Sequence, residues 1–281
     1  MTGLGEYAYP IELAGKIRLV VEDHALLAWA QENGRTPGAA QMEALRNGII
    51  PLRYSKNVTA LTIEEQERLC SSSVLVCGCG GLGGILMQLL ARAGVGSLRI
   101  VDGDTFTPSN LNRQLLSDTR GLSRPKVQVA AETVQAVNPL VEVDAIREML
   151  GEGNAELLVR GVDLVVDALD NIEGRLHLAA AARHLMLPFI HGAVAGWWGQ
   201  VSTFLPTSPY DLTNIYGAKR SRDPAEQELG VLGPAAAIIG GLQALEAVRI
   251  LCGRLPVYSE LLLYFDGESG RMEMIPLSDE P

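Results

Sequence analysis

Between residues 73 and 195, short apolar runs alternate with longer segments that carry an apolar residue every three or four positions. Five runs rich in β-branched residues predict strands: SVLVCG, SLRIVD, VEVDAIREM, VDLVVDAL and PFIHGAVAG. The segments between them predict helices: GILMQLLARAGV, PKVQVAAETVQAVNP, AELLVRG and EGRLHLAAAARHLM. Strands that alternate with helices build a parallel sheet from β-α-β units. The predicted fold is therefore α/β, with a doubly wound, Rossmann-like and mostly parallel sheet.

The first fifty residues show a helical pattern instead. Apolar side chains in residues 13–34 recur at spacings that approximate one stripe of a helix. Residues 36–48 predict a second helix, with Thr36 as its N-cap. We therefore expect residues 1–50 to form an N-terminal helical extension and residues 51–281 to form the α/β domain.

Two later segments differ from this alternation. Residues 206–234 are polar and rich in turn residues, which predicts a long crossover loop of the kind that is usually functional or mobile. Residues 231–248 are the longest apolar stretch, yet they include a proline, three glycines, a glutamine and a glutamate. This composition predicts a close-packed buried helix and not a membrane span.

The bulk composition narrows the partners and the compartment. A net charge of −10 disfavours a nucleic-acid partner, because phosphate binding needs a basic surface. The N-terminal sequence lacks the basic start and apolar run of a secretory signal, so we expect a cytoplasmic protein without a membrane partner. The four cysteines include no C-x-x-C pair, so they predict neither a disulfide framework nor a zinc site built from such pairs.

A glycine-rich turn follows the first strand of the α/β pattern. Gly78, Gly80 and Gly83 form a G-x-G-x-x-G motif, and Asp102 stands nineteen residues after the last glycine. Glycines let a backbone approach a phosphate closely, the following helix offers free N–H groups, and an acid at the next strand end accepts hydrogen bonds from a ribose. This context predicts a nucleotide site, but it does not choose between NAD, FAD and ATP.

The segment after Asp102 favours phosphate chemistry. Five polar or charged residues lie within about 25 positions of it: Asp104, Asn110, Arg113, Gln114 and Lys126. Adenylyl transfer needs cations that hold the triphosphate and neutralise charge as pyrophosphate leaves, whereas hydride transfer needs an apolar slot. Further along, Asp167 and Asp170 follow another strand, where a carboxylate is placed to hold magnesium.

Together these motifs resemble the MoeB/ThiF/HesA family of adenylyltransferases, which are relatives of the ubiquitin-activating enzymes. The resemblance covers roughly residues 50–275 and rests on GCGGLG (78–83), VDGDTF (101–106), SNLNRQ (109–114), GLSRPKV (121–127), NP (138–139), ALDN (168–171), GAVAGWWGQV (192–201) and GVLGPAAAIIGGLQALEAVRIL (230–251). It implies a ThiF-type domain that binds ATP with magnesium and adenylates the C-terminal Gly-Gly carboxylate of a small ubiquitin-like carrier protein. The expected pathway is sulfur transfer in the biosynthesis of a cofactor such as molybdopterin or thiamin.

The resemblance also implies roles for individual residues. Arg113, Lys126 and Asp170 would be catalytic, with Asp170 as the magnesium ligand. The remaining nucleotide-binding residues would be Gly78, Gly80, Gly81 and Gly83 at the phosphates, Asp102 at the ribose, and Asp104, Asn110 and Gln114.

The sequence departs from the family pattern at three places. The region FLPTSPYDLTNIYG lacks the zinc-binding cysteines of many relatives, so we expect no zinc. The loop RDPAEQELGV has Glu226 near the place of a transfer cysteine, and we interpret Cys77, Cys79 and Cys252 as structural. The chemistry is therefore expected to stop at the acyl-adenylate, with sulfur supplied by a separate donor protein.

The third departure concerns PLRYSKNVT (51–59). Arg53 and Tyr54 match a family element in which a later arginine reaches the ATP of the other subunit, and Lys56 stands in place of that arginine. The resemblance thus implies a homodimer in which Lys56 binds nucleotide in trans. The four histidines show no ligand spacing, and a structural role is expected for them.

Three alternatives remain open from the sequence. The protein could activate a peptide or a modified tRNA base with ATP, although its acidic charge counts against tRNA. It could also be an inactive scaffold subunit of the same fold, which the retention of Arg113, Lys126 and Asp170 disfavours. An NAD oxidoreductase is disfavoured by SNLNRQ.

Overall fold

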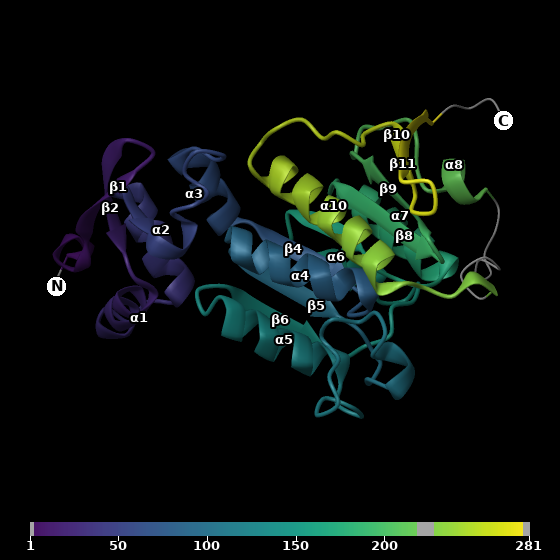
Figure 1. Ribbon diagram of the computed structural model, residues 1–281, viewed down its shortest axis with the longest axis horizontal. Coiled ribbons are helices and arrows are strands. Elements are labelled where there is room, and N and C mark those ends of the chain that lie inside the picture. The colour runs from purple at the N-terminus through teal and green to yellow at the C-terminus, as the bar shows by residue number, and fades with distance from the viewer. Residues whose placement is uncertain (1–2, 218–227, 278–281) are drawn as a thin grey trace.

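The computed structural model describes residues 3–217 and 228–277, which contain one eight-stranded sheet and one three-stranded sheet (Figure 1). The strands of the large sheet are β4 (Ser73–Cys77), β5 (Ser97–Val101), β6 (Glu142–Ile146), β7 (Leu164–Asp167), β8 (Phe189–Ala195), β9 (Trp198–Phe204), β10 (Leu261–Asp266) and β11 (Arg271–Pro276). The helices associated with it are α3 (Ile63–Ser71), α4 (Gly81–Ala93), α5 (Lys126–Val137), α6 (Ala155–Val159), α7 (Ile172–His184), α8 (Thr213–Tyr216) and α10 (Gly233–Leu251). Two short 3-10 helices, η2 (Leu52–Tyr54) and η3 (Pro108–Asn110), lie in its connections.

The strand order creates a reversal point in the middle of the large sheet. The order is β11-β10-β9-β8-β7-β4-β5-β6, so the chain runs outward from β4 through β5 to β6 and then returns to β7 on the other side of β4. Strands β6, β5, β4, β7 and β8 are mutually parallel, whereas β9, β10 and β11 pair antiparallel. Ligands of doubly wound sheets bind at the carboxyl ends of the strands beside such a reversal.

Helices cover both faces of the sheet, and alternate strand residues face each layer. In β4, Val74 and Val76 pack in the core with α4, α5 and α10, while Leu75 and Cys77 pack in the core with α6 and α7. Both layers are visible in Figure 1, where α10 lies alongside α4. The unbroken apolar runs of the sequence therefore reflect strands that are buried on two sides.

The predicted fold class is confirmed for the parallel half of the sheet. All five predicted strands form β4 to β8, and the helices predicted between them form α4 to α7. The antiparallel strands β9, β10 and β11 were not predicted.

The N-terminal extension is only partly helical, so that prediction was wrong in its first part. Residues 9–21 form a hairpin of β1 (Tyr9–Leu13) and β2 (Lys16–Val21), which β3 (Ile49–Pro51) extends. The chain reverses at Ala14 and Gly15, which have φ values of 50° and 74°. Ile17, Leu19 and Val21 alternate as in a strand, whereas Leu13, Ile17 and Val20 have spacings of four and three as in a helix. The tight turn at Ala14 and Gly15 decides between the two.

The second part of the extension is helical as predicted. Helices α1 (Asp23–Glu32) and α2 (Pro37–Arg46) follow the hairpin, and the Thr36 hydroxyl accepts a hydrogen bond from the amide of Ala39 at 3.2 Å. A short 3-10 helix, η1 (Leu4–Tyr7), precedes the hairpin. The predicted boundary at residue 50 falls inside β3.

A buried polar joint connects this N-terminal unit to the large sheet. Asn138, fully buried, donates to the hydroxyl of Tyr54 at 3.0 Å and to the carbonyl of Ala91 at 2.8 Å. The Tyr54 hydroxyl in turn donates to Gln41 in α2 at 2.9 Å. Tyr54 and Asn138 thus link α2, the end of α4 and the end of α5. Both belong to motifs on which the family resemblance rests, RY (53–54) and NP (138–139), so these two motif residues stabilise the fold.

Helix α10 is the one helix among the described residues that is long and apolar enough to cross a membrane, and half of it is buried within the protein. It packs against α4 and against strands β8 and β9. This placement agrees with the prediction of a packed core helix.

Replacement of Asn138 is expected to destabilise the protein strongly. Asn138→Ala leaves the amide of Leu140, which bonds to Asn138 Oδ1 at 3.1 Å, buried without a partner. It also removes one of the two hydrogen bonds that the Ala91 carbonyl accepts, the other coming from the Gly94 amide. We expect a loss of about 2–3 kcal/mol in the free energy of unfolding, measured by urea denaturation. The exposed Asn47→Ala is the control, with an expected loss of less than about 1 kcal/mol. Equal losses for the two variants would contradict the role of the joint.

Candidate active site

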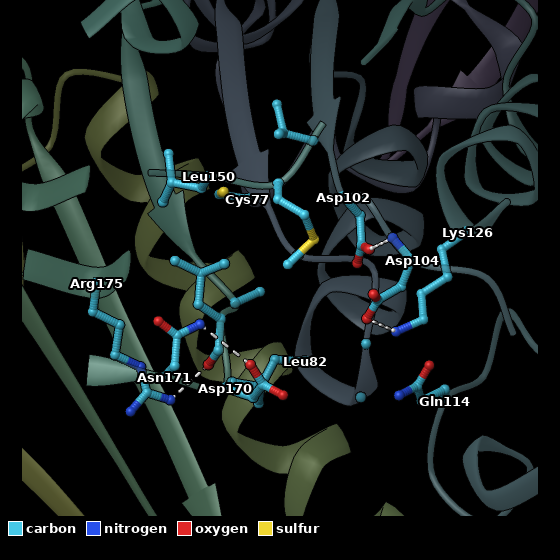
Figure 2. Close-up of a pocket in the computed structure, with 18 of the residues that line it drawn as sticks. Cys77, Leu82, Asp102, Asp104, Gln114, Lys126, Leu150, Asp170, Asn171 and Arg175 are labelled. Atoms are coloured by element: carbon cyan, nitrogen blue, oxygen red, sulfur yellow. Dashed lines mark hydrogen bonds and ion pairs between the residues drawn. The ribbon is translucent and has the colours of Figure 1, made fainter. Parts of the chain in front are cut away.

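A cleft opens at the carboxyl ends of β4, β5 and β7, beside the reversal of the sheet (Figure 2). Its empty volume, including space open to solvent, is about 890 Å³. Nine of the predicted site residues line it: Gly78, Gly80, Gly81, Asp102, Asp104, Arg113, Gln114, Lys126 and Asp170. Figure 2 shows Asp102, Asp104 and Lys126 on one side of the cleft and Asp170 on the other.

The floor of the cleft is the glycine turn between β4 and α4. Gly78 has a φ of 106°, and a Cβ atom there would collide with the carbonyl of Ala168. Gly83 does not line the cleft; a side chain on it would collide with the carbonyl of Gly78, so it allows α4 to pack onto the strand end. The first N–H groups of α4 have no partner within the helix, and together with the helix dipole they favour a bound anion.

Asp102 at the end of β5 is held in place by the backbone. Its two carboxylate oxygens accept hydrogen bonds from the amide of Cys79 at 2.7 Å and from the amide of Asp104 at 2.8 Å. Each carboxylate oxygen has a second lone pair that can accept a hydroxyl group. The carboxylate is therefore fixed and still able to bind a ribose.

Lys126 lies in the wall of the cleft and is paired with an acid. The Lys126 side chain is 9% exposed, and its ammonium lies 3.2 Å from the Asp104 carboxylate, which is 60% exposed. The Lys126 amide also donates to the Asp104 carbonyl at 2.9 Å. An incoming phosphate therefore has to compete with Asp104 for this cation.

Arg113 and Gln114 supply further polar groups. The Arg113 guanidinium donates to the Ser109 carbonyl at 3.0 Å and to the Asn112 side chain at 2.9 Å. The Oε1 atom of Gln114 is buried and has no hydrogen-bond donor among the described residues. A buried acceptor without a donor costs free energy, so a bound ligand or water that donates to it is favoured.

The two aspartates at the end of β7 have different environments. Asp170 is exposed at the cleft, so its carboxylate is accessible to a metal ion. Asp167 is fully buried: one carboxylate oxygen accepts from the Leu169 amide at 2.9 Å, and the other lies 2.7 Å from His191 and 3.5 Å from Arg175. The earlier interpretation of Asp167 as a possible magnesium ligand is therefore wrong, because this carboxylate is taken up by internal partners.

Three predicted positions lie elsewhere. Asn110 does not line the cleft; its side chain accepts a hydrogen bond from the Thr107 amide at 2.9 Å and so closes the turn of η3. Lys56 is exposed beside Asn57, which donates to the carbonyl of Ala93 at the far end of α4. Since α4 has 13 residues, Lys56 lies roughly 20 Å from the glycine turn of its own chain. Glu226 lies outside the described residues.

Arg175 is a cleft residue that the sequence analysis missed. It lines the cleft from α7 and its side chain is 2% exposed. The sequence did contain one indication of its burial: Arg175 lies on the same helix face as Ile172 and Leu178, at spacings of three residues. A charged side chain on an apolar helix face has to find a buried partner.

The donor set suits magnesium that arrives with a nucleotide. Among the described residues, no three or more His, Cys, Asp or Glu side chains form a group that could hold a metal ion. Magnesium commonly uses one or two carboxylates together with substrate phosphates, so Asp170 beside a triphosphate fits it. The absence of zinc stays a prediction.

Comparison with known proteins gives the family. The ThiF family profile matches residues 54–281. The chain belongs to the ThiF family.

The relatives agree with this assignment. The molybdopterin-synthase adenylyltransferase of Haemophilus influenzae is 36% identical over 80% of this chain and 94% of its own. The sulfur carrier protein adenylyltransferase of Thermus thermophilus is 40% identical over 72% of this chain and 77% of its own. A crystal structure of Escherichia coli MccB with ATP has a TM-score of 0.70 over 82% of this chain and 72% of its own, at 16% identity, and thus supports the ThiF-type fold.

The four cysteines should be unreactive in the folded protein. All are buried, and burial raises the pKa of Cys70 to about 12 and the pKa values of Cys77, Cys79 and Cys252 above the usual thiol range. At pH 8 we expect less than about one thiol per chain to react with Ellman's reagent, and all four to react in guanidinium. Ser71→Cys, at an exposed position next to Cys70, is the control and should add one fast thiol. If a thiol of the folded wild-type protein reacted fast with Ellman's reagent, this prediction would be wrong and a covalent role for a cysteine would have to be considered.

Proposed function

We propose that this ThiF-family protein adenylates the C-terminal Gly-Gly carboxylate of a ubiquitin-like sulfur carrier, releasing pyrophosphate, for sulfur transfer in cofactor biosynthesis. The observation that carries the proposal is the convergence of Arg113, Lys126 and Asp170 on one cleft with the glycine turn and Asp102. The names of the relatives support it, since they are adenylyltransferases of sulfur carriers and of molybdopterin synthase.

The cleft suits the charges that this reaction creates. The carrier carboxylate is already ionised near pH 7, so its attack on the α-phosphorus of ATP needs no general base. The new bond joins the carboxylate oxygen to the α-phosphorus, and the bond to the departing pyrophosphate breaks. Negative charge builds on the α-phosphate and on pyrophosphate, and we assign Arg113 and Lys126 to neutralise it. Asp170 would hold the magnesium ion, which screens the phosphate charge.

The residues that line the first cleft favour adenylyl transfer over the alternatives that the sequence left open. Hydride transfer would need an apolar nicotinamide slot, whereas this cleft contains the cations Arg113, Lys126 and Arg175. An inactive scaffold subunit has no need for an accessible Asp170 opposite Lys126. The net charge of −10 disfavours tRNA as the acceptor.

The aromatic walls of a second cleft favour a substrate chain end without bulky side chains, such as Gly-Gly. It adjoins the first cleft, with which it shares Arg175 and Val194, and its walls include Trp198, Tyr216 and Tyr264. A tail that ends in two glycines needs no space for side chains between such aromatic walls. We therefore place the carrier tail in this second cleft, with its carboxylate directed toward the glycine turn.

The chemistry is proposed to end at the acyl-adenylate. Every cysteine of the chain is buried. Cys77 lies in the wall of the cleft, but burial raises the pKa of its thiol, so a thiolate that could attack the adenylate is not formed near pH 7. A separate protein would then deliver sulfur. ATP and a free carrier are available together in the cytoplasm, where we expect the reaction to take place.

We also propose a homodimer in which Lys56 acts on the partner's nucleotide. Lys56 lies too far from the cleft of its own chain to reach it. Exposed apolar side chains on the adjacent helices α4 and α10, at Leu89, Ile238 and Leu245, offer a surface for a second copy. These helices flank the cleft, so a contact there brings two active sites close together.

Pyrophosphate exchange tests the reaction. Purified protein with magnesium and a carrier ending in Gly-Gly should incorporate labelled pyrophosphate into ATP. We expect Arg113→Ala to lower the exchange rate on the order of 100-fold, because one transition-state charge contact is lost. Arg120→Ala is the matched control; this residue lies in the same loop, has a 92% exposed side chain and should leave the rate nearly unchanged. No exchange with any Gly-Gly carrier, or tight NAD binding without ATP binding, would refute the function.

Mixing two inactive variants tests the trans role of Lys56. In a dimer of one Lys56→Ala chain and one Arg113→Ala chain, one cleft keeps its own Arg113 and receives Lys56 from the partner. Random mixing should therefore restore about a quarter of the wild-type exchange activity, since half of the dimers are mixed and each has one complete site. The proposal would be contradicted if the mixture showed no more exchange activity than the two variants separately. It would also be contradicted if light scattering gave the molar mass of a monomer for the active protein.

A further inference from the structure

A cluster of buried polar side chains lies where the two clefts adjoin, and no catalytic role was assigned to it above. It contains Asp167 of β7, Arg175 of α7, His191 of β8, Gln200 of β9 and Tyr216 of α8. The Tyr216 hydroxyl is at its centre, 3.1 Å from Arg175 Nη1, 3.0 Å from His191 Nε2 and 3.0 Å from Gln200 Nε2.

The hydrogen bonds of the cluster have a defined direction. Burial lowers the pKa of His191, against the opposing effect of Asp167, so this imidazole is neutral near pH 7. With its Nδ1 proton donated to Asp167 at 2.7 Å, its Nε2 accepts the proton of the Tyr216 hydroxyl. The oxygen of Tyr216 is then left to accept from Arg175 and Gln200.

Arg175 connects this hydroxyl to the first cleft. While Nη1 bonds to Tyr216, Nη2 donates to the carbonyl of Leu169 at 2.6 Å (Figure 2). The Leu169 amide bonds to Asp167, so the residue before Asp170 is held at both its amide and its carbonyl. The Arg175 contact is thus made by the residue directly before the proposed magnesium ligand.

Tyr216 also belongs to the crossover segment, residues 206–234, and lines the second cleft with Arg175. One hydroxyl therefore joins the segment beside the proposed tail cleft to the loop that carries Asp170. Removing it would take one buried hydrogen bond from charged Arg175 and one from His191, whose Nε2 atom would keep only Gln200 Nε2, at 3.2 Å, as a side-chain partner.

We propose that Tyr216 and His191 are positioning residues: they fix Arg175 against the loop of Asp170, so that helix α8 and the proposed magnesium-binding loop are held together. This inference rests on the proposed binding of ATP with magnesium in the first cleft. It predicts an effect on metal-dependent nucleotide binding, which a general packing role would not single out.

Calorimetry of ATP binding, with excess magnesium and with EDTA, tests this. Tyr216→Phe keeps the ring and removes the hydroxyl; we expect about ten-fold weaker binding of ATP with magnesium and less than a two-fold change without it. His191→Asn, which keeps a donor to Asp167 and removes the acceptor for Tyr216, should do the same. The double variant should be no weaker than either single variant, because both act through Arg175. Tyr9→Phe, which removes a hydroxyl that bonds to Glu22 in the N-terminal unit, away from both clefts, is the control and should leave ATP binding unchanged under both conditions.

The outcomes separate this inference from the proposed function. Wild-type binding of ATP with magnesium, together with unchanged binding in Tyr216→Phe and His191→Asn, would overturn the positioning role alone. Equal losses with and without magnesium in folded variants, or additive losses in the double variant, would overturn it as well. If wild type shows no magnesium-dependent ATP binding, both proposals fail. Should Tyr216→Phe not fold, His191→Asn carries the same expectation.

Discussion

The close approach of two strand ends, Gly78 after β4 and Ala168 after β7, is the constraint on which the rest of the site depends. Because no side chain fits between them, the glycine turn and the loop of Asp170 lie in contact across the reversal of the sheet. The turn then directs the N-terminus of α4 into the cleft, while the loop places its carboxylate opposite. A larger residue at Gly78 would move the glycine turn, where we propose that phosphate binds, away from the loop of the proposed magnesium ligand Asp170.

Around this contact, the cleft is built from groups that hold one another in place. Asp102 is fixed by two backbone amides, and the Asp170 loop by Arg175. Fixed dipoles and charges need little reorganisation when a reaction builds charge, which is the main way an enzyme without a general base accelerates a step. The proposed chemistry therefore depends on rigidity in the same loops that we propose bind the nucleotide.

Sequence reasoning succeeded where the information is local. The strands β4 to β8 are continuous apolar runs, and the glycine turn, Asp102 and Lys126 lie within or just after recognisable elements. It failed where contacts between distant segments decide the structure. The hairpin of residues 9–21 has a pattern that fits two periods, and Arg175, His191 and Tyr216 meet only after α7, β8 and α8 have packed. Asn110 and Asp167 carry side chains of the expected type, but neighbouring groups inside the protein already occupy them.

The ion pair of Lys126 with Asp104 has a consequence for discrimination among anions in the cell. Asp104 is tethered near the ammonium at a high effective concentration, so it acts as a built-in competitor. A small anion such as inorganic phosphate that bound at Lys126 alone would have to displace this carboxylate for a single contact. In the proposed binding mode a nucleoside triphosphate also contacts the glycine turn, Asp102 and Arg113, and these contacts would compensate for the displacement. The ion pair would thus favour the nucleotide over free phosphate at this site.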